Sequence, residues 1–372
     1  MLHKYRRYLL LLLAVLALAI FVYKFRNSIT LEGFHWSLVG ASLRRARLGL
    51  LILSLVAIYG CYAVRALRWQ RFCRALGGAR FWSVYAATLM GFACTFILGR
   101  AGEPIRPVLI AKKDSLSIPR MFGVYVLERV FDMASAAVIA GVALLAFEQH
   151  GISGEAGARI MTVARTGGAL LLVALVVVIS FLVYFRYHGG EWLGRKLKHS
   201  KWRHGWRGRV ATLLEGFSEG LQGIRTAADL GVLVAYSAIH WILVVMVYLW
   251  VARAFGGELA ALTFAGALLV LAFTLIGSAV QLPGVGGGAQ LATFLVLTLI
   301  FGVEKEPAAT VSIVLWLISF AGCCLVGLPL LFREGWSMGE LRRMAAAEEH
   351  VAEEIESAEW IRDTKSPGES PR

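Results

Sequence analysis

The sequence predicts an all-α, polytopic membrane protein with about six to eight spanning helices and one or two re-entrant or broken elements. Of the 372 residues, 58% are hydrophobic, and the mean hydropathy is +0.68. A soluble domain is rarely so apolar, because it needs a polar surface. The apolar residues form continuous runs rather than the alternating pattern of a transmembrane β-barrel, and two runs end at stretches rich in glycine and proline.

The apolar runs define two parts of the chain, a membrane domain at 1–332 and a tail at 333–372. A basic segment precedes the first run, and Lys24 and Arg26 follow it instead of a cleavage site, so we expect an uncleaved helix. Ser337 and Glu340 form a capping box, so we expect the tail to be a cytoplasmic polar helix that becomes disordered. The runs are 8–23, 48–64, 81–98, 121–147, 165–185, 230–251, 260–280, 289–303 and 308–332.

The distribution of Lys and Arg predicts the orientation. The net charge of +14 does not indicate nucleic-acid binding here, because basic residues of a membrane protein mark its cytoplasmic side. Segment 186–229 holds nine Lys or Arg and four acids, so it should be cytoplasmic, as should both termini. If every run crossed, this segment would lie outside. We therefore expect 81–98 to be the first arm of a re-entrant element.

Arg65, Arg68, Arg71 and Arg74 follow the second run with a spacing of three residues. This spacing places them on one helical face. With Trp69 beside them, they are typical of a helix that lies on anionic lipid headgroups, and we interpret them as such.

Two stretches interrupt apolar regions. "GRAGEPIRPVLIAKKD" at 99–114 combines charges with two glycines and two prolines, and "AVQLPGVGGGAQL" at 279–291 is rich in glycine. Irregular backbone at membrane depth must be buried in protein or line a wet cavity. One interrupted segment in each half indicates an inverted repeat with a site between the halves. Loop charges leave open whether 260–280 and 289–303 cross or form a second re-entrant hairpin.

Segment 121–147 carries charge at membrane depth. Glu128 and Asp132 share one helical face with Tyr125 and Ser135, and Arg129 lies next to it. Each such charge costs roughly 2.5–3.5 kcal/mol on insertion scales, so these charges must be paired. The partners we expect are in the broken stretch, with Glu103 pairing Arg129 and Arg106 pairing Asp132, and Arg100 close by. Two interpretations stay open: a salt-bridge network that braces the fold, and a polar lining for lipid headgroups.

Familiar catalytic patterns are missing from the sequence. The glycine-rich stretch lacks the Lys-Ser/Thr of a phosphate loop, and the histidines lack metal-ligand spacing. The five cysteines lie in or beside apolar runs as small apolar residues. We expect no enzyme activity, no cofactor and no metal.

Three blocks, 65–77, 98–135 and 282–319, resemble the lysylphosphatidylglycerol synthase transmembrane family, also called flippase-like integral membrane proteins. The central block is specific: Gly-Arg-x-Gly-Glu-x-x-Arg at 99–106 precedes Glu-Arg-x-x-Asp at 128–132. Family members commonly have an acid where this chain has Gln290. Full synthases add a large cytoplasmic domain, whereas this sequence continues for about 40 residues after its last run, so we do not expect synthase activity.

The resemblance implies an inner-membrane protein that moves an anionic phospholipid or a polyprenyl-linked lipid between leaflets. Membrane lipids with anionic headgroups are then the expected partners. The alternative is a non-transporting accessory subunit of a lipid-modifying or glycan-assembly enzyme. The candidate substrate-binding residues are Arg100, Glu103, Arg106, Glu128, Arg129, Asp132, Pro283, Gly284 and Gly286.

Overall fold

The computed structural model describes residues 35–146, 226–278, 281–282 and 286–335, with single helical positions at 166, 169, 173, 176, 177, 180 and 339. The predicted helix 8–23, most of the run 165–185, the basic segment up to residue 225 and the tail beyond residue 339 lie outside the described residues.

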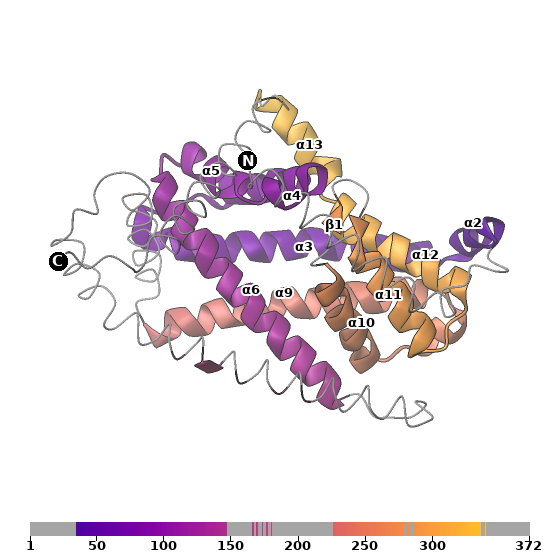
Figure 1. Ribbon diagram of the computed structural model, residues 1–372. Helices are drawn as coiled ribbons and strands as arrows, with labels where there is room; N and C mark the ends of the chain where they lie inside the picture. The colour runs from indigo at the N-terminus through magenta and orange to yellow at the C-terminus, as the bar shows by residue number, and fades with distance from the viewer. Residues whose placement is uncertain are drawn as a thin grey trace, which may run out of the picture.

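The described residues form an all-α polytopic membrane protein (Figure 1), as the sequence predicted. Four helices are long and apolar enough to cross a membrane. The first part of the chain contains α2 (Trp36–Arg45), α3 (Leu48–Cys73), α4 (Phe81–Leu98), α5 (Ile105–Lys113) and α6 (Ile118–Ala146), with 3-10 turns at Arg74–Leu76 and Gly99–Gly102. The second contains α9 (Ala227–Ala254), a 3-10 turn at Gly257–Ala261, α10 (Phe264–Gly277), β1 (Gln281–Leu282), β2 (Gly286–Gly287), α11 (Gly288–Leu299), α12 (Lys305–Trp316), a π turn at Leu317–Ala321 and α13 (Cys324–Arg333).

Helices α4 and α5 form a helical hairpin, hairpin 1 (residues 81–113). Helix α4 ends at Gly99, whose φ of 67° glycine adopts without steric cost. Pro104 is the N-cap of α5, where its missing N–H costs nothing. The chain then runs back along α4: a Cβ on Gly91 would lie 2.6 Å from the Cβ of Arg106, and one on Gly102 would lie against the Cys94 carbonyl. Glycine at both positions therefore lets the two arms touch.

Helices α10 and α11 form hairpin 2 (residues 264–299), and the short length of its two arms favours a re-entrant hairpin over two crossing helices. Its arms have 14 and 12 residues, about 21 and 18 Å, so neither alone spans a ~30 Å core. Thr274 Oγ1 lies 2.7 Å from Thr293 Oγ1 between the arms, and Gly277 packs against Gly288. Strands β1 and β2 close the turn.

The two hairpins enter the bundle from opposite ends and meet at their tips. Helices α3 and α9 pack antiparallel, because the start of α3 bonds the end of α9 (Arg47 N to Ala254 O, 2.8 Å), whereas Arg71 near the end of α3 pairs Asp229 at the start of α9. Hairpin 1 follows the end of α3, and hairpin 2 follows the end of α9. Strand β1, at the tip of hairpin 2, contacts the turn Gly99–Gly102 at the tip of hairpin 1.

The two parts of the chain repeat one design: a long helix, a hairpin and a second long helix. The contacts between them match as well, since α6 packs on α10 of the other hairpin and α13 packs on α4. Because the equivalent helices α3 and α9 are antiparallel, the axis that relates the halves is perpendicular to them. This arrangement is that of an inverted repeat, although the two halves share no evident sequence similarity.

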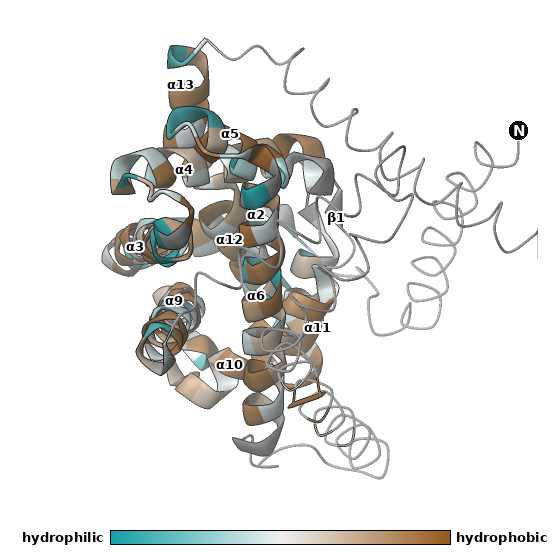
Figure 2. Cartoon of the chain, turned by 90° about the vertical axis from the view of Figure 1, so that its left-hand side faces the viewer, coloured by the Kyte–Doolittle hydropathy of each residue, from teal (hydrophilic) through white to brown (hydrophobic). Residues whose placement is uncertain are grey.

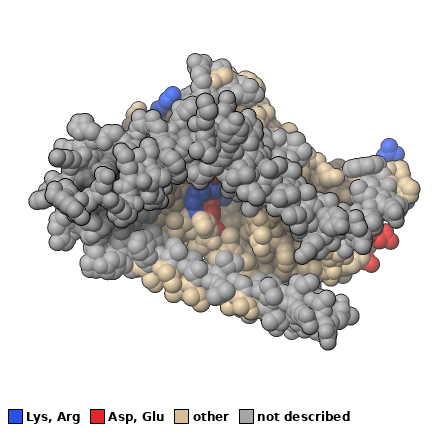
Figure 3. Space-filling view, in the orientation of Figure 1, with Lys and Arg blue, Asp and Glu red and all other residues tan. Residues whose placement is uncertain are grey.

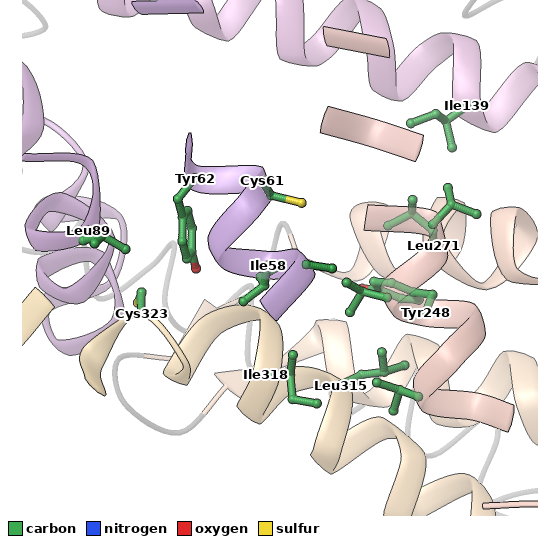
Figure 4. Packing of buried hydrophobic residues seen from close by; sticks show 14 of the residues in the cluster. Ile58, Cys61, Tyr62, Leu89, Ile139, Tyr248, Leu271, Leu315, Ile318 and Cys323 are labelled. Atoms are coloured by element: carbon green, nitrogen blue, oxygen red, sulfur yellow. The ribbon is translucent and has the colours of Figure 1, made fainter. Parts of the chain in front are cut away.

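Part of the core lies where α3 crosses the last long helix, which comprises α12, the π turn and α13 (Lys305–Arg333). Figure 4 shows Ile58 and Tyr62 of α3 in the same buried layer as Ile318 and Cys323. The π turn at Leu317–Ala321 frees backbone carbonyls, and α3 supplies donors: Tyr62 Oη bonds the Ser319 carbonyl at 3.3 Å, and Tyr59 Oη bonds that of Gly322 at 2.8 Å.

The outer surface of the bundle is apolar, as expected of a membrane protein, and Figure 2 shows hydrophobic residues along α6, α10 and α11 with hydrophilic ones at the free end of α13. Val56, Trp82, Met133 and Ile276 are large hydrophobic residues that remain exposed. Exposed side chains of this kind would face lipid.

We expect the outer ends of the two hairpins to be accessible from opposite sides of the membrane. Arg80 precedes hairpin 1 and Glu258 precedes hairpin 2, and both are exposed. In a Cys324→Ser background, whose other cysteines are buried, an impermeant thiol reagent added to intact cells should label Glu258→Cys. It should label Arg80→Cys only after permeabilisation. The end of α3 is richer in arginine than the end of α9, and arginine-rich ends of membrane helices are usually cytoplasmic. Labelling of both sites from one side would contradict the inverted arrangement.

Candidate functional site

The buried charge cluster forms where α3, α5 and α6 meet, and Glu128 is its centre. Glu128 is fully buried. One carboxylate oxygen lies 3.1 Å from Arg65 and 3.0 Å from Arg68, and the other accepts from Arg106. A single carboxylate thus contacts three guanidinium groups from two other helices, and Arg129 of its own helix lies 3.5 Å from the second oxygen.

Asp132 forms the second level of the cluster, one helical turn along α6. Its oxygens lie 2.5 Å from Arg65, 2.7 Å from Arg68 and 2.9 Å from Arg129. Arg65 and Arg68 therefore bridge both acids. The spacing of three residues on α3 matches the spacing of four on α6, so two arginines face two carboxylates across the helix contact.

The third level links the cluster to hairpin 1. Glu103 lies in the turn before α5, 3.6 Å from Arg129, and accepts a hydrogen bond of 2.7 Å from Tyr125 Oη. The Arg129 guanidinium also lies 5.3 Å from the Tyr125 ring centre, a cation–π contact.

Surrounding side chains fix the buried arginines. Arg106 lies over the Trp69 ring at 4.7 Å and near the Phe92 ring at 5.6 Å. From α9, Ser237 accepts from Arg68 at 3.0 Å, and His240 Nε2 lies 3.4 Å from Arg65. Aromatic stacking is a favourable environment for guanidinium and a poor one for ammonium, which explains arginine here rather than lysine.

The cluster holds more positive than negative charge. Among the side chains that the structure describes, Arg65, Arg68, Arg106 and Arg129 face Glu103, Glu128 and Asp132, so the cations outnumber the acids by one. Each of the four guanidinium groups also keeps a buried N–H that finds no acceptor in the described part of the chain. Buried polar groups normally find partners, so this arrangement can accept an anion.

The cluster is closed on one side and open on the other. The Glu128 side chain is inaccessible, whereas those of Arg129 and Glu103 are 35% and 28% exposed. In Figure 3, basic and acidic atoms of described residues are visible from one side of the molecule, among atoms of other described residues. A charged group can therefore reach Arg129 and Glu103 without unfolding the protein.

The structure brings five of the sequence-predicted site residues together: Glu103, Arg106, Glu128, Arg129 and Asp132. The predicted pair Glu103–Arg129 is confirmed. The predicted pair Arg106–Asp132 is wrong, because Arg106 projects from α5 onto Glu128, one turn nearer the start of α6. Both stretches of sequence allowed either pairing, and only the register of α5 on α6 decides between them.

Among the remaining predicted residues, the structure places the backbones of Arg100 and Gly286 at the tips of the two hairpins. The backbone of Arg100 belongs to the 3-10 turn, and its side chain is outside the described residues, as are Pro283 and Gly284. Gly286 is in β2. The strand β1, which pairs with β2, contacts the turn that contains Arg100, so the described tips of the two hairpins meet.

The interpretation of the arginine row as a lipid-facing stripe was wrong for its first members. Arg65 and Arg68 are buried and bind Glu128 and Asp132, and Arg71 pairs Asp229 at 2.5 Å. Only Arg74 is exposed. The missed signal was the spacing: the row offers arginines three residues apart, which matches the spacing of four between the two buried acids of α6.

Gln290 has a local role at the tip of hairpin 2. Its side-chain carbonyl accepts from the Gly287 backbone N–H and so caps the start of α11. This bond needs an oxygen acceptor but no charge, so glutamine can serve where an acid is common in the resembled family. Among the described residues, no group of three or more His, Cys, Asp or Glu could hold a metal ion.

Comparison with protein families finds that residues 9–327 match the family described as "Lysylphosphatidylglycerol synthase TM region". This range covers most of the chain and contains every residue of the cluster. A comparison with curated proteins finds no match.

Proposed function

Because the chain belongs to the lysylphosphatidylglycerol synthase TM region family, we propose that it moves a phosphate-bearing lipid between the leaflets of the cytoplasmic membrane. The headgroup passes the buried charge cluster while the tails stay in lipid. Both termini lie in the cytoplasm, as the basic segments predict. No covalent change of the lipid is part of this proposal.

The observation that carries the proposal is the buried cluster with its surplus cation and its open side. Charge at membrane depth is costly and is rarely kept without a function. A network that only braced the fold would be expected to balance its charges and saturate its N–H groups. The described side chains of this network do neither, and they adjoin the meeting point of two hairpins.

The lipid phosphate can enter the cluster by replacing a carboxylate as the ion-pair partner of an arginine. Arginine binds carboxylate and phosphate through the same two-pronged geometry, so Arg129 can release Glu103 or Asp132 and bind a phosphate oxygen pair instead. Hairpins that enter from opposite ends provide two gates, one on each side of the cluster. Opening them in turn exposes the site to one leaflet at a time, which allows downhill or ion-coupled movement.

We expect Arg129→Gln to slow lipid movement about tenfold to a hundredfold, because a charge-assisted hydrogen bond is worth ~1.5–3 kcal/mol. The measurement is the translocation of fluorescent phospholipid in proteoliposomes that contain the purified protein. Arg74→Gln is the matched control, because Arg74 is exposed and outside the cluster. It should transport at the wild-type rate.

The assay also separates the rival functions. A folded wild-type protein that moves no lipid would favour the accessory-subunit alternative and contradict the proposal. Mass spectrometry of the recovered lipid should show an unchanged species, and a new covalent product would indicate an enzyme instead. Equal rates for Arg129→Gln and wild type would remove the cluster from the transport path.

A further inference from the structure

We infer that Lys113 and Glu334 form an ionic latch, which joins the outer end of hairpin 1 to the end of α13 and keeps the gate of hairpin 1 closed at rest. The Lys113 ammonium donates a hydrogen bond to the Glu334 carboxylate. This inference rests on the proposed function, because it concerns access to the buried charge cluster. It places a control point outside the cluster, on the side that the arginine bias predicts to be cytoplasmic.

The latch joins two elements that are distant in sequence, and solvent reaches it. Lys113 is the last residue of α5, and Glu334 is the C-cap of α13, 221 residues later. Their side chains are 24% and 27% exposed. An ion pair in contact with water and salt is weak and exchanges easily. Such a pair contributes little to folding, but it suits a contact that must open and close repeatedly.

Helix α13 is held firmly at its base and less firmly at its end. At the base, Tyr59 Oη donates to the Gly322 carbonyl at 2.8 Å. A Cβ on Gly327 would lie against the Leu89 carbonyl of α4, so the two backbones touch there. Pro329 follows inside the helix and lacks the N–H of a regular turn. The helix can therefore bend after Gly327, and its last turn can leave hairpin 1 while its base stays in place.

Helix α5 connects the latch to the charge cluster. Arg80 Nε donates to Asp114 Oδ1 at 3.2 Å, which ties the start of α4 to the end of α5. Helix α5 has nine residues, with Arg106 near its start and Lys113 at its end, about 10 Å apart. Because so short a helix moves as one body, a shift at Lys113 also moves Arg106, the partner of Glu128.

The first test reverses the charges of the latch. Lys113→Glu brings two carboxylates together and Glu334→Lys brings two ammonium groups together. Each single variant should therefore open the gate more often and move fluorescent phospholipid about twofold to fivefold faster in proteoliposomes. The double variant Lys113→Glu with Glu334→Lys restores opposite charges and should return to the wild-type rate. Arg74→Glu reverses an exposed charge outside the latch and should leave the rate unchanged.

The second test locks the gate covalently. In the Cys324→Ser background, Lys113→Cys and Glu334→Cys are joined by a short bis-methanethiosulfonate reagent. The joined protein should move lipid at least about tenfold more slowly, because the gate can no longer open, and reduction should restore the rate. Each single-cysteine variant should keep its rate after the same treatment.

The third test follows the gate without lipid movement. Spin labels are placed at Ser117→Cys and Arg333→Cys, two exposed positions on either side of the latch, in the Cys324→Ser background. Pulsed electron resonance on the full-length protein in nanodiscs measures the distance between the labels. We expect one short distance with an intact latch. A second, longer distance should appear with Lys113→Glu and disappear when Glu334→Lys is added.

The outcomes separate the latch from transport. In a protein that moves lipid, the inference is overturned by a wild-type rate in Lys113→Glu, by undiminished transport after crosslinking, or by label distances that do not respond. In a protein that moves no lipid, the label distances decide alone: a response upholds the latch and its absence overturns it. Such a protein contradicts the proposed function in either case.

Discussion

Glu128→Gln is expected to destabilise the protein by about 3–5 kcal/mol, because it leaves buried arginines without their central counter-ion. Glu128 is inaccessible and contacts Arg65, Arg68 and Arg106. Asp132 can still serve the first two, but Arg106 loses its carboxylate partner. The loss should appear as a large drop in the midpoint of unfolding of the purified protein and in its yield from membranes.

The control for this effect is Glu103→Gln, which removes an acid of the same cluster from its open side. Because Glu103 is partly exposed, water can solvate its partner, and the cost should stay within about 1 kcal/mol. Equal stabilities of Glu128→Gln and wild type would contradict the central role of Glu128.

Replacing both partners separates bracing from binding. In the double variant Arg106→Leu with Glu128→Leu, no unpaired charge of the pair remains, so folding should recover relative to the single variants. We expect this variant to be stable but unable to move lipid, because the site loses its deep cation. A double variant that folds and transports would show that the network is structural, and the path should then be sought around Gly286.

Gly102→Val is expected to prevent hairpin 1 from closing, at a cost of about 3 kcal/mol or more. A Cβ at this position would lie 2.7 Å from the Thr95 backbone nitrogen as well as against the Cys94 carbonyl. Backbone atoms cannot rotate away as a side chain can, so α5 must move off α4. That movement would carry Arg106 away from Glu128 and disrupt the cluster as well as the hairpin.

The matched control is Gly231→Val, a helical glycine on α9 at which an added Cβ meets nothing within 4 Å. Its effect should be small and set by helix propensity alone. Thermal unfolding in detergent compares the two variants, and similar unfolding midpoints for both would refute the close approach of α5 to α4 at this point.

The sequence predicted the local features of this protein well, because hydrophobicity and backbone preferences act over short distances. The apolar run 81–98 coincides with α4, and the break after it follows from Gly99 and the two prolines near the start of α5. Glu128 and Asp132 could be assigned to one helical face from their spacing alone. Their need for cations followed from the cost of charge at membrane depth.

The sequence alone could not predict which cations those would be. Arg65 and Arg68 are about 60 residues from their acids along the chain, and a row of arginines at helical spacing fits lipid headgroups as well as buried carboxylates. The choice depends on whether that face of α3 packs against α6.

Sequence alone determined that this protein spans the membrane, where its helices break and which acids need partners, since each is a property of a short segment. Tertiary structure decided that the broken segments fold into hairpins from opposite ends, that Arg106 pairs Glu128 rather than Asp132, and that the described cations of the cluster outnumber its described acids by one. The physical reason is that pairing and charge balance depend on the register of helices distant in sequence, which packing fixes and local preference does not.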